Sequence, residues 1–122
     1  MTAPVIPQLE AAAEGSRGLD ETVAFALGWT VDPDGVWRHP GNYKVAVHPF
    51  YTQSVDAALT LILDGMWFKL GKGRLRRDEP LYGAILFKPN RSGLGGKKIA
   101  EADARTMPLA IVIAALRARG IA

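Results

Sequence analysis

The pattern of apolar residues predicts an α+β fold, specifically an α/β/α sandwich in which a single, mainly antiparallel sheet lies between helices. Two observations predict it. Apolar residues recur at helical spacing near both ends of the chain and once in the middle, and β-hairpin patterns, rather than single strands, lie between these segments. The length of 122 residues and the hydrophobic content of 48% suit one domain, residues 1–122, with its own core.

Four segments have the apolar spacing of helices. They cover residues 5–14, 17–27 and 55–63, with a last helix that begins after Thr106. Ser54 and Thr106 are expected to cap their helices, because a hydroxyl can accept from a free backbone N–H of the first turn. Gly28 is expected to end the second helix. The apolar run 109–116 predicts that the last helix is buried on the sheet.

Strands are predicted between these helices. The first hairpin pairs residues 29–31 with 36–38 around Asp32-Pro33-Asp34-Gly35, in which Pro and Gly favour a tight turn. Three more strands are expected at 66–70, 81–88 and 97–104, the last of them polar on one face.

The composition excludes several chemistries. The chain has no Cys, so it can form neither a disulfide framework, a thiolate metal site nor a cysteine nucleophile. The N-terminal residues lack the basic and apolar regions of a signal peptide, and the longest apolar run is far shorter than the ~20 residues that span a bilayer. We therefore expect a cytoplasmic protein with no membrane partner.

The basic residues are concentrated in one part of the chain. Residues 69–98 hold nine Lys and Arg but only two Asp and Glu, a net charge of +7. The rest of the chain has a net charge of −4, which gives +3 overall. A basic segment on an acidic body points to an anionic partner such as a nucleotide, a nucleic acid or an acidic protein surface.

Two loops of this segment, residues 71–80 and 89–98, form the predicted binding surface. Gly residues can present backbone N–H groups to phosphate, and Arg can bind phosphate through two hydrogen bonds. Because both loops connect strands of one predicted sheet, they could lie side by side. The alternative is a solvated hairpin whose charges prevent aggregation at a sheet edge. The predicted ligand-binding or partner-binding residues are Lys69, Lys72, Arg74, Arg76, Arg77, Arg91, Lys97 and Lys98.

No catalytic, metal-binding or cofactor-binding residues are predicted. His39 and His48 could join Asp32 or Asp34 in a metal site, but their spacing matches no metal motif, and two surface histidines are the preferred interpretation. The glycine-rich residues 93–96 are neither a P-loop nor a dinucleotide fingerprint. The function is therefore expected to be binding rather than catalysis.

Three segments in order, residues 19–29, 49–59 and 104–118, resemble those of the small phage ABA sandwich domain proteins of bacteriophages and prophages. The resemblance covers most of the chain and implies an α/β/α sandwich, but no activity. In this sequence the two basic loops are longer and more basic than is usual for the family. Caps and apolar stripes account for the shared motifs, so a function of this particular chain is expected in the loops.

The resemblance suggests a non-enzymatic phage or prophage accessory protein that inhibits host defence. Two mechanisms fit: the capture of a nucleotide messenger between the basic loops, or the occlusion of a host protein. The alternatives are a protein that binds nucleic acid without sequence preference and a small phosphoesterase. An antiparallel sheet edge and the aromatic residues also offer contacts for a homo-oligomer.

Overall fold

The protein is described by a computed structural model over residues 4–62, 65–72, 81–89 and 96–122. The chain forms four helices and six strands there, in an order close to the predicted one. They are α1 (Val5–Ala11), α2 (Arg17–Ala26), β1 (Thr30–Val31), β2 (Trp37–Arg38), β3 (Lys44–Val45), α3 (Val55–Leu59), β4 (Trp67–Lys72), β5 (Tyr82–Pro89), β6 (Gly96–Ala104) and α4 (Met107–Ala118).

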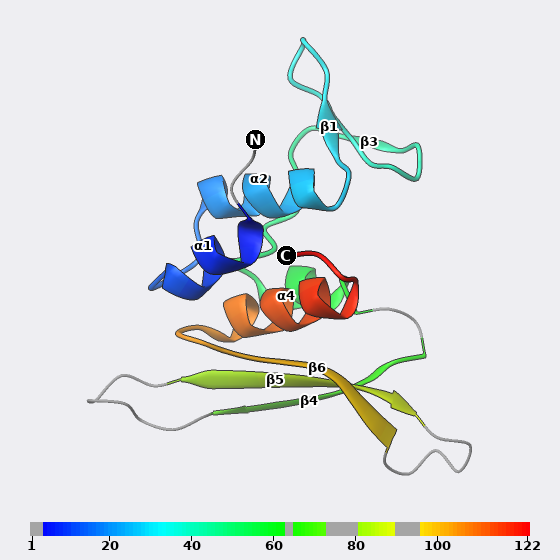
Figure 1. The fold of residues 1–122 in the computed structure, drawn as a ribbon. Coiled ribbons are helices and arrows are strands. Elements are labelled where there is room, and N and C mark those ends of the chain that lie inside the picture. Colours follow the sequence, from blue (N-terminus) through cyan, green and yellow to red (C-terminus); the bar gives the residue numbers. More distant parts are fainter. Residues whose placement is uncertain (1–3, 63–64, 73–80, 90–95) are drawn as a thin grey trace.

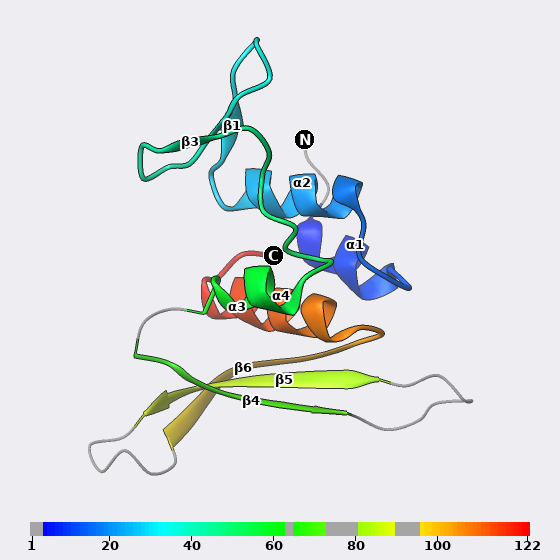
Figure 2. The ribbon, with the colours of Figure 1, turned by 180° about the vertical axis from the view of Figure 1, so that it is seen from behind.

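These elements confirm the α+β class. The described strands form two antiparallel sheets of three strands, β1-β2-β3 and β4-β5-β6, rather than one. Figures 1 and 2 show the four helices on one side of the larger sheet, with the smaller sheet projecting beyond α2. The predicted single sheet between two layers of helices is therefore not confirmed: the described helices leave one face of the larger sheet uncovered.

The core lies between α4 and the larger sheet. All residues from Leu109 to Leu116 are at most 1% exposed, because α4 packs on β5 and β6 on one side and on α1 and α3 on the other. Ala84, Leu86 and Ala102 supply the sheet side of this core. The expected burial of the last helix is thus confirmed, and neighbours on both sides explain why the helix is apolar nearly all round.

Capping residues define the helix ends as predicted. The Ser54 hydroxyl accepts from the Ala57 N–H at 3.2 Å, and the Thr106 hydroxyl accepts from the Leu109 N–H at 3.4 Å. Gly28 follows α2 with a φ of +96°, the left-handed conformation that ends many helices at a glycine. A third cap, at Ser16, was not predicted, although its hydroxyl accepts from the Leu19 N–H at 3.1 Å.

The smaller sheet contains one strand more than the sequence predicts. The tight turn at 32–35 is confirmed, since the Gly35 N–H donates to the Asp32 carbonyl at 2.8 Å. The additional strand is β3, which pairs with β2. It is only two residues long, so its sequence has too little alternation to reveal a strand.

A buried carboxylate joins α2 to the segment before α3. Asp20 is 0% exposed and accepts hydrogen bonds from the Thr52 N–H at 2.7 Å, from the Thr52 hydroxyl, and from the Gln53 side-chain amide at 2.6 Å. The Ser16 N–H donates to the Thr52 hydroxyl at 3.1 Å. Asp20 is neither a cap nor part of an apolar stripe, so the expectation that those two roles explain every shared motif position is wrong here.

None of the helices in the described ranges is long and apolar enough to cross a membrane.

Candidate anion-binding site

Half of the predicted binding residues lie in the described part of the chain. Lys69 and Lys72 are on β4, and Lys97 and Lys98 are on β6; all four are exposed. Arg74, Arg76, Arg77 and Arg91 lie outside the described residues.

The sheet topology separates the described lysines. β5 pairs with β4 through Lys72↔Tyr82 at one end and with β6 through Pro89↔Gly96 at the other. Seven strand steps separate Tyr82 from Pro89, about 24 Å at ~3.4 Å per residue. The strands that flank residues 73–80 therefore end at one end of the sheet, and those that flank 90–95 end at the other. The expectation that the two loops lie side by side concerns residues outside the described ranges; the structure shows only that the strands leading into them end at opposite ends of the three-stranded meander.

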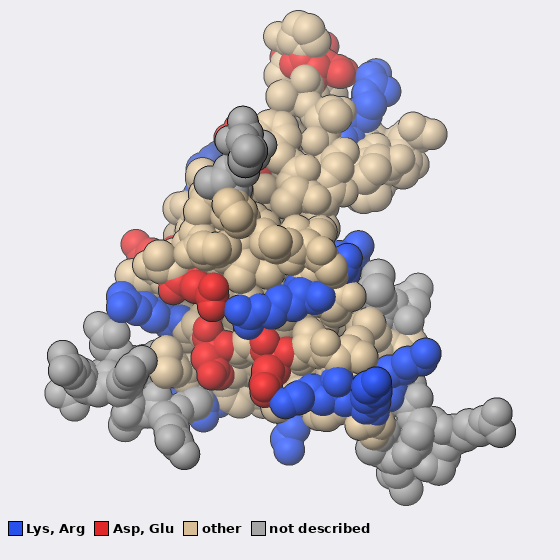
Figure 3. Space-filling view, in the orientation of Figure 1, with Lys and Arg blue, Asp and Glu red and all other residues tan. Residues whose placement is uncertain are grey.

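Two lysines face each other at the second of these ends. Lys88 on β5 pairs directly with Lys97 on β6, and both are exposed. Like charges directly opposite each other destabilise an antiparallel pair. In the described residues neither lysine has an ion pair, whereas neighbouring Lys98 binds Glu101 at 2.9 Å. Figure 3 shows Lys and Arg side chains gathered over this end of the sheet, with Asp and Glu side chains further along it.

A like-charged cross-strand pair in the smaller sheet has a compensating carboxylate, whereas the Lys88–Lys97 pair has none among the described residues. Arg38 on β2 faces Lys44 on β3, but Asp32 compensates Arg38 through an ion pair of 3.1 Å. Lys88 was not among the predicted binding residues, because the sequence does not show the register that places it opposite Lys97. Only its membership of the basic segment could have drawn attention to it.

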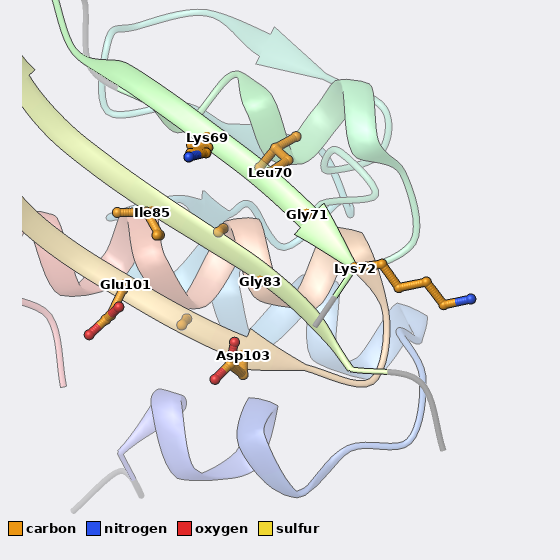
Figure 4. Close-up of a pocket in the computed structure, with 10 residues that line it drawn as sticks. Lys69, Leu70, Gly71, Lys72, Gly83, Ile85, Glu101 and Asp103 are labelled. Carbon is orange, nitrogen blue, oxygen red and sulfur yellow. The ribbon is translucent and has the colours of Figure 1, made fainter. Parts of the chain in front are cut away.

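A shallow hollow of about 200 Å³ lies on the larger sheet. Gly71 and Gly83 face each other in its floor, and the absence of their side chains opens it. Lys69 lies on its β4 side, while Glu101 and Asp103 lie on its β6 side (Figure 4). The hollow therefore has cationic and anionic sides, and it is not a purely basic pocket.

A second cavity, of about 320 Å³, lies between the smaller sheet and the ends of the helices. Its lining includes Trp29, His39, Tyr43, Tyr51 and Arg119. The rings contact each other: His39 stacks on Tyr43 with ring centroids 4.2 Å apart, and Trp29 meets both edge-on. This cluster was not predicted, because its members are distant in sequence.

Several polar groups of this aromatic cluster bind partners within the protein. The Trp29 indole N–H donates to the Tyr51 hydroxyl at 3.2 Å, and the Gly41 N–H donates to His39 Nδ1 at 2.7 Å. Arg119 donates to the Leu61 carbonyl at 3.0 Å. The Trp29–Tyr51 bond joins the residue before β1 to the segment before α3, so we interpret the cluster as a structural joint.

His48 differs from the predicted surface histidine. It is 4% exposed, its ring meets Trp37 edge-on at 4.6 Å, and its Nδ1 lies 3.2 Å from the Pro49 carbonyl. The ring therefore packs in the smaller sheet as part of the fold. Within the described ranges, no group of three His, Asp or Glu side chains is placed to hold a metal ion.

No family model, curated protein or solved structure matches this chain.

The aromatic joint predicts a pH dependence of stability. Burial raises the pKa of the Tyr51 phenol above its ordinary value of 10.0, although the Trp29 hydrogen bond and nearby Arg119 lower it. Above about pH 10 the unfolded chain therefore loses this proton first, and the free energy of unfolding falls as the pH rises through the folded pKa. Tyr51→Phe should make this fall shallower in thermal melts between pH 8 and pH 11.

Tyr43→Phe is the control, because the Tyr43 side chain is 52% exposed rather than buried. Tyr51→Phe should also cost about 1 kcal/mol at neutral pH, because the buried Trp29 N–H loses its acceptor. An unchanged slope in Tyr51→Phe would contradict the assignment.

Proposed function

We propose that this protein binds an extended polyanion, such as a nucleic acid strand, through the basic ends of its larger sheet. The observation that carries the proposal is the exposed Lys88–Lys97 pair, which no ion pair compensates within the described residues. A cross-strand pair of like charges weakens the sheet, and an anion bound between the two ammonium groups would remove that cost. Neighbouring Lys98 points to the other face of the sheet and is compensated by Glu101, so the proposal rests on the pair itself.

The separation of the basic ends favours an extended ligand over a compact one. A single nucleotide cannot bridge ends that lie about 24 Å apart, whereas a nucleic acid strand presents phosphates over that distance. The topology therefore supports the nucleic-acid alternative more than the capture of a messenger between adjacent loops. We favour binding over phosphoester hydrolysis because a charge pair gives affinity for an anion but supplies neither a nucleophile nor a general base.

An inhibitory role toward host defence also remains a proposal, and the resemblance to phage ABA sandwich domain proteins alone supports it. Binding of nucleic acid by this surface would be compatible with such a role, since it could compete with a host protein for the same strand.

Lys97→Glu tests the proposal, because binding and stability should move in opposite directions. The substitution turns a repulsive cross-strand pair into an attractive one, so the free energy of unfolding should rise by about 0.2–1 kcal/mol. Affinity for a labelled single-stranded 20-mer of DNA or RNA should fall in low salt. The slope of log affinity against log salt should also become less steep by about 0.7 or more, as expected for the loss of a phosphate contact.

Lys44→Glu is a matched control. It makes the same charge change in another like-charged cross-strand pair, opposite Arg38 in the smaller sheet. It should leave binding nearly unchanged. The proposal is wrong if the wild-type protein binds neither strand at low ionic strength, or if both variants weaken binding equally.

A further inference from the structure

The face of the larger sheet that the described helices leave uncovered, called the uncovered face below, has an apolar centre. Cross-strand partners share a face of a sheet, and α4 covers the face that holds Ala84 and Leu86. The central strand β5 therefore presents Gly83, Ile85 and Phe87 on the opposite face. A face meant only for solvent is typically polar, so the apolar central strand calls for an explanation.

The two outer strands give this face opposite charges on its two sides. Opposite Ile85, β4 contributes Lys69 and β6 contributes Glu101. Opposite Gly83, β4 contributes Gly71 and β6 contributes Asp103, as Figure 4 shows. In these two rows the β4 side thus carries a cation and the β6 side carries carboxylates, of which Glu101 also binds Lys98 of its own strand at 2.9 Å.

The cross-strand partners of Phe87 form a third row on this face, after those of Gly83 and Ile85, and this row adds aromatic surface. Trp67 on β4 pairs with Phe87, which pairs in turn with Lys98 on β6. Trp67 is 50% exposed, a large fraction for an indole ring. An apolar centre with charged sides is the arrangement found at protein–protein interfaces.

We propose that the uncovered face of the β4-β5-β6 sheet binds a second copy of this chain around a twofold axis parallel to β5. This rotation places β4 of one copy over β6 of the other and keeps the position along the strand. Lys69 of each copy then faces Glu101 of the other, while the two Ile85 side chains meet at the centre. The face is thus complementary to itself, as an interface between identical subunits must be.

The charge pattern selects this arrangement over its alternative. A twofold axis across the strands would place β4 over β4 and, when centred on the row of Lys69, would set the two Lys69 ammonium groups against each other. The parallel axis avoids this repulsion. It also fits aligned sheet packing, in which strands of facing sheets run within about 30° of each other.

The hollow on this face fits the same packing. Gly71 of one copy lies opposite Asp103 of the other, so the missing side chain leaves room for the facing carboxylate. Gly83 lies on the central strand, where the two copies approach most closely. A glycine inside a strand often marks close approach by another chain or a ligand, and here two such glycines are paired.

The inference goes beyond the proposed function and does not depend on it. The two β5 strands run in the same direction in this dimer, so both Lys88–Lys97 pairs lie at the same end. They belong to the face that α4 partly covers, as their parity with Leu86 on β5 shows, so they remain outside the interface. Dimerisation would therefore place the two basic pairs at one end of the dimer, on its two outer faces and pointing away from each other.

The test is the mass in solution, measured by light scattering during size-exclusion chromatography and by sedimentation over a range of concentrations. The wild-type protein should have about twice the chain mass of 13.2 kDa. Lys69→Glu and Glu101→Lys should each weaken the dimer at least tenfold, because each sets like charges against each other. The double variant should restore most of the affinity, because both cross-copy pairs re-form with reversed charges.

Glu21→Lys provides the control, because it makes the same charge change as Glu101→Lys at an exposed position of α2. It should leave the dimer intact. Ile85→Asp should give a monomer. If this variant fails to fold, Lys69→Glu, Glu101→Lys and the double variant still test the interface. A wild-type monomer at all concentrations would overturn the proposal, as would a dimer that Lys69→Glu leaves unchanged or a swap that restores nothing. Nucleic-acid binding by a monomer that quenches Trp67 fluorescence would assign the face to the polyanion and would also overturn it.

Discussion

Replacing Gly15 with alanine is expected to lower the free energy of unfolding by about 3 kcal/mol or more. A Cβ at this position would lie 1.8 Å from the carbonyl oxygen and 2.3 Å from the carbonyl carbon of Thr52. Both atoms belong to the backbone, so no rotamer change relieves the clash, and overpacking of a tight site costs about 1–3 kcal/mol or more. The hydrogen bonds between Ser16 and Thr52 would have to lengthen as the segments separate. Urea denaturation followed by circular dichroism measures the effect.

Gly18→Ala is the matched control, three residues along the chain. A Cβ there has Ser16 Oγ as its nearest neighbour at 4.0 Å, and the residue lies in α2. Alanine should be neutral or stabilise the protein by up to ~1 kcal/mol, because glycine is a poor helix former. A free energy of unfolding for Gly15→Ala within about 1 kcal/mol of the wild-type value would contradict the close approach of Gly15 to Thr52.

Asp20→Ala is the second substitution with a large expected effect. It removes the acceptor of three hydrogen bonds, two from Thr52 and one from Gln53. Each bond to a charged acceptor contributes about 1.5–3 kcal/mol, and buried donors left without a partner add their desolvation cost. Because these bonds are coupled and do not add fully, we expect a loss of about 3–5 kcal/mol in the free energy of unfolding. Thermal and urea unfolding both report it.

Two further variants distinguish the loss of the Asp20 hydrogen bonds from the effect of removing any carboxylate at this place in α2. Asp20→Asn keeps one side-chain oxygen as an acceptor for Thr52, so its loss should be smaller than that of Asp20→Ala. Glu21→Ala removes an exposed neighbouring carboxylate of the same helix and should change stability by no more than about 0.5 kcal/mol. Equal effects of Asp20→Ala and Glu21→Ala would contradict a structural role for the buried carboxylate.

Elements with strong local signals could be predicted from the sequence. The apolar run 109–116 and the cap at Thr106 indicated α4, and the turn residues 32–35 indicated the β1–β2 hairpin. Both signals act within a few residues, where capping, turn geometry and side-chain spacing decide the conformation. The strand β3 was missed because two residues carry no periodicity, and the end of α3 was placed four residues too late, at 63 rather than Leu59.

In the candidate site, too, some features could be predicted from the sequence and others depend on how the strands pair. The concentration of basic residues in 69–98 can be counted from the sequence, and its described members lie on the strands of the larger sheet. The sequence did not reveal which cations lie together, because that depends on strand register. Lys88 meets Lys97 only through the pairing of β5 with β6, including the irregularity between Leu86 and Phe87 that shifts the register by one residue.

The sequence by itself determined the α+β class, most of the helices and strands and the location of the excess positive charge. Only the tertiary structure decided that the strands form two sheets, that the basic hairpin strands end at opposite ends of β5, and that Asp20 binds Thr52 across 32 residues. The physical reason is the distance along the chain over which each kind of interaction acts. Helix caps, turns and apolar periodicity are set by neighbours in the chain, whereas sheet order, register and buried polar contacts are set by segments that meet only when the chain folds.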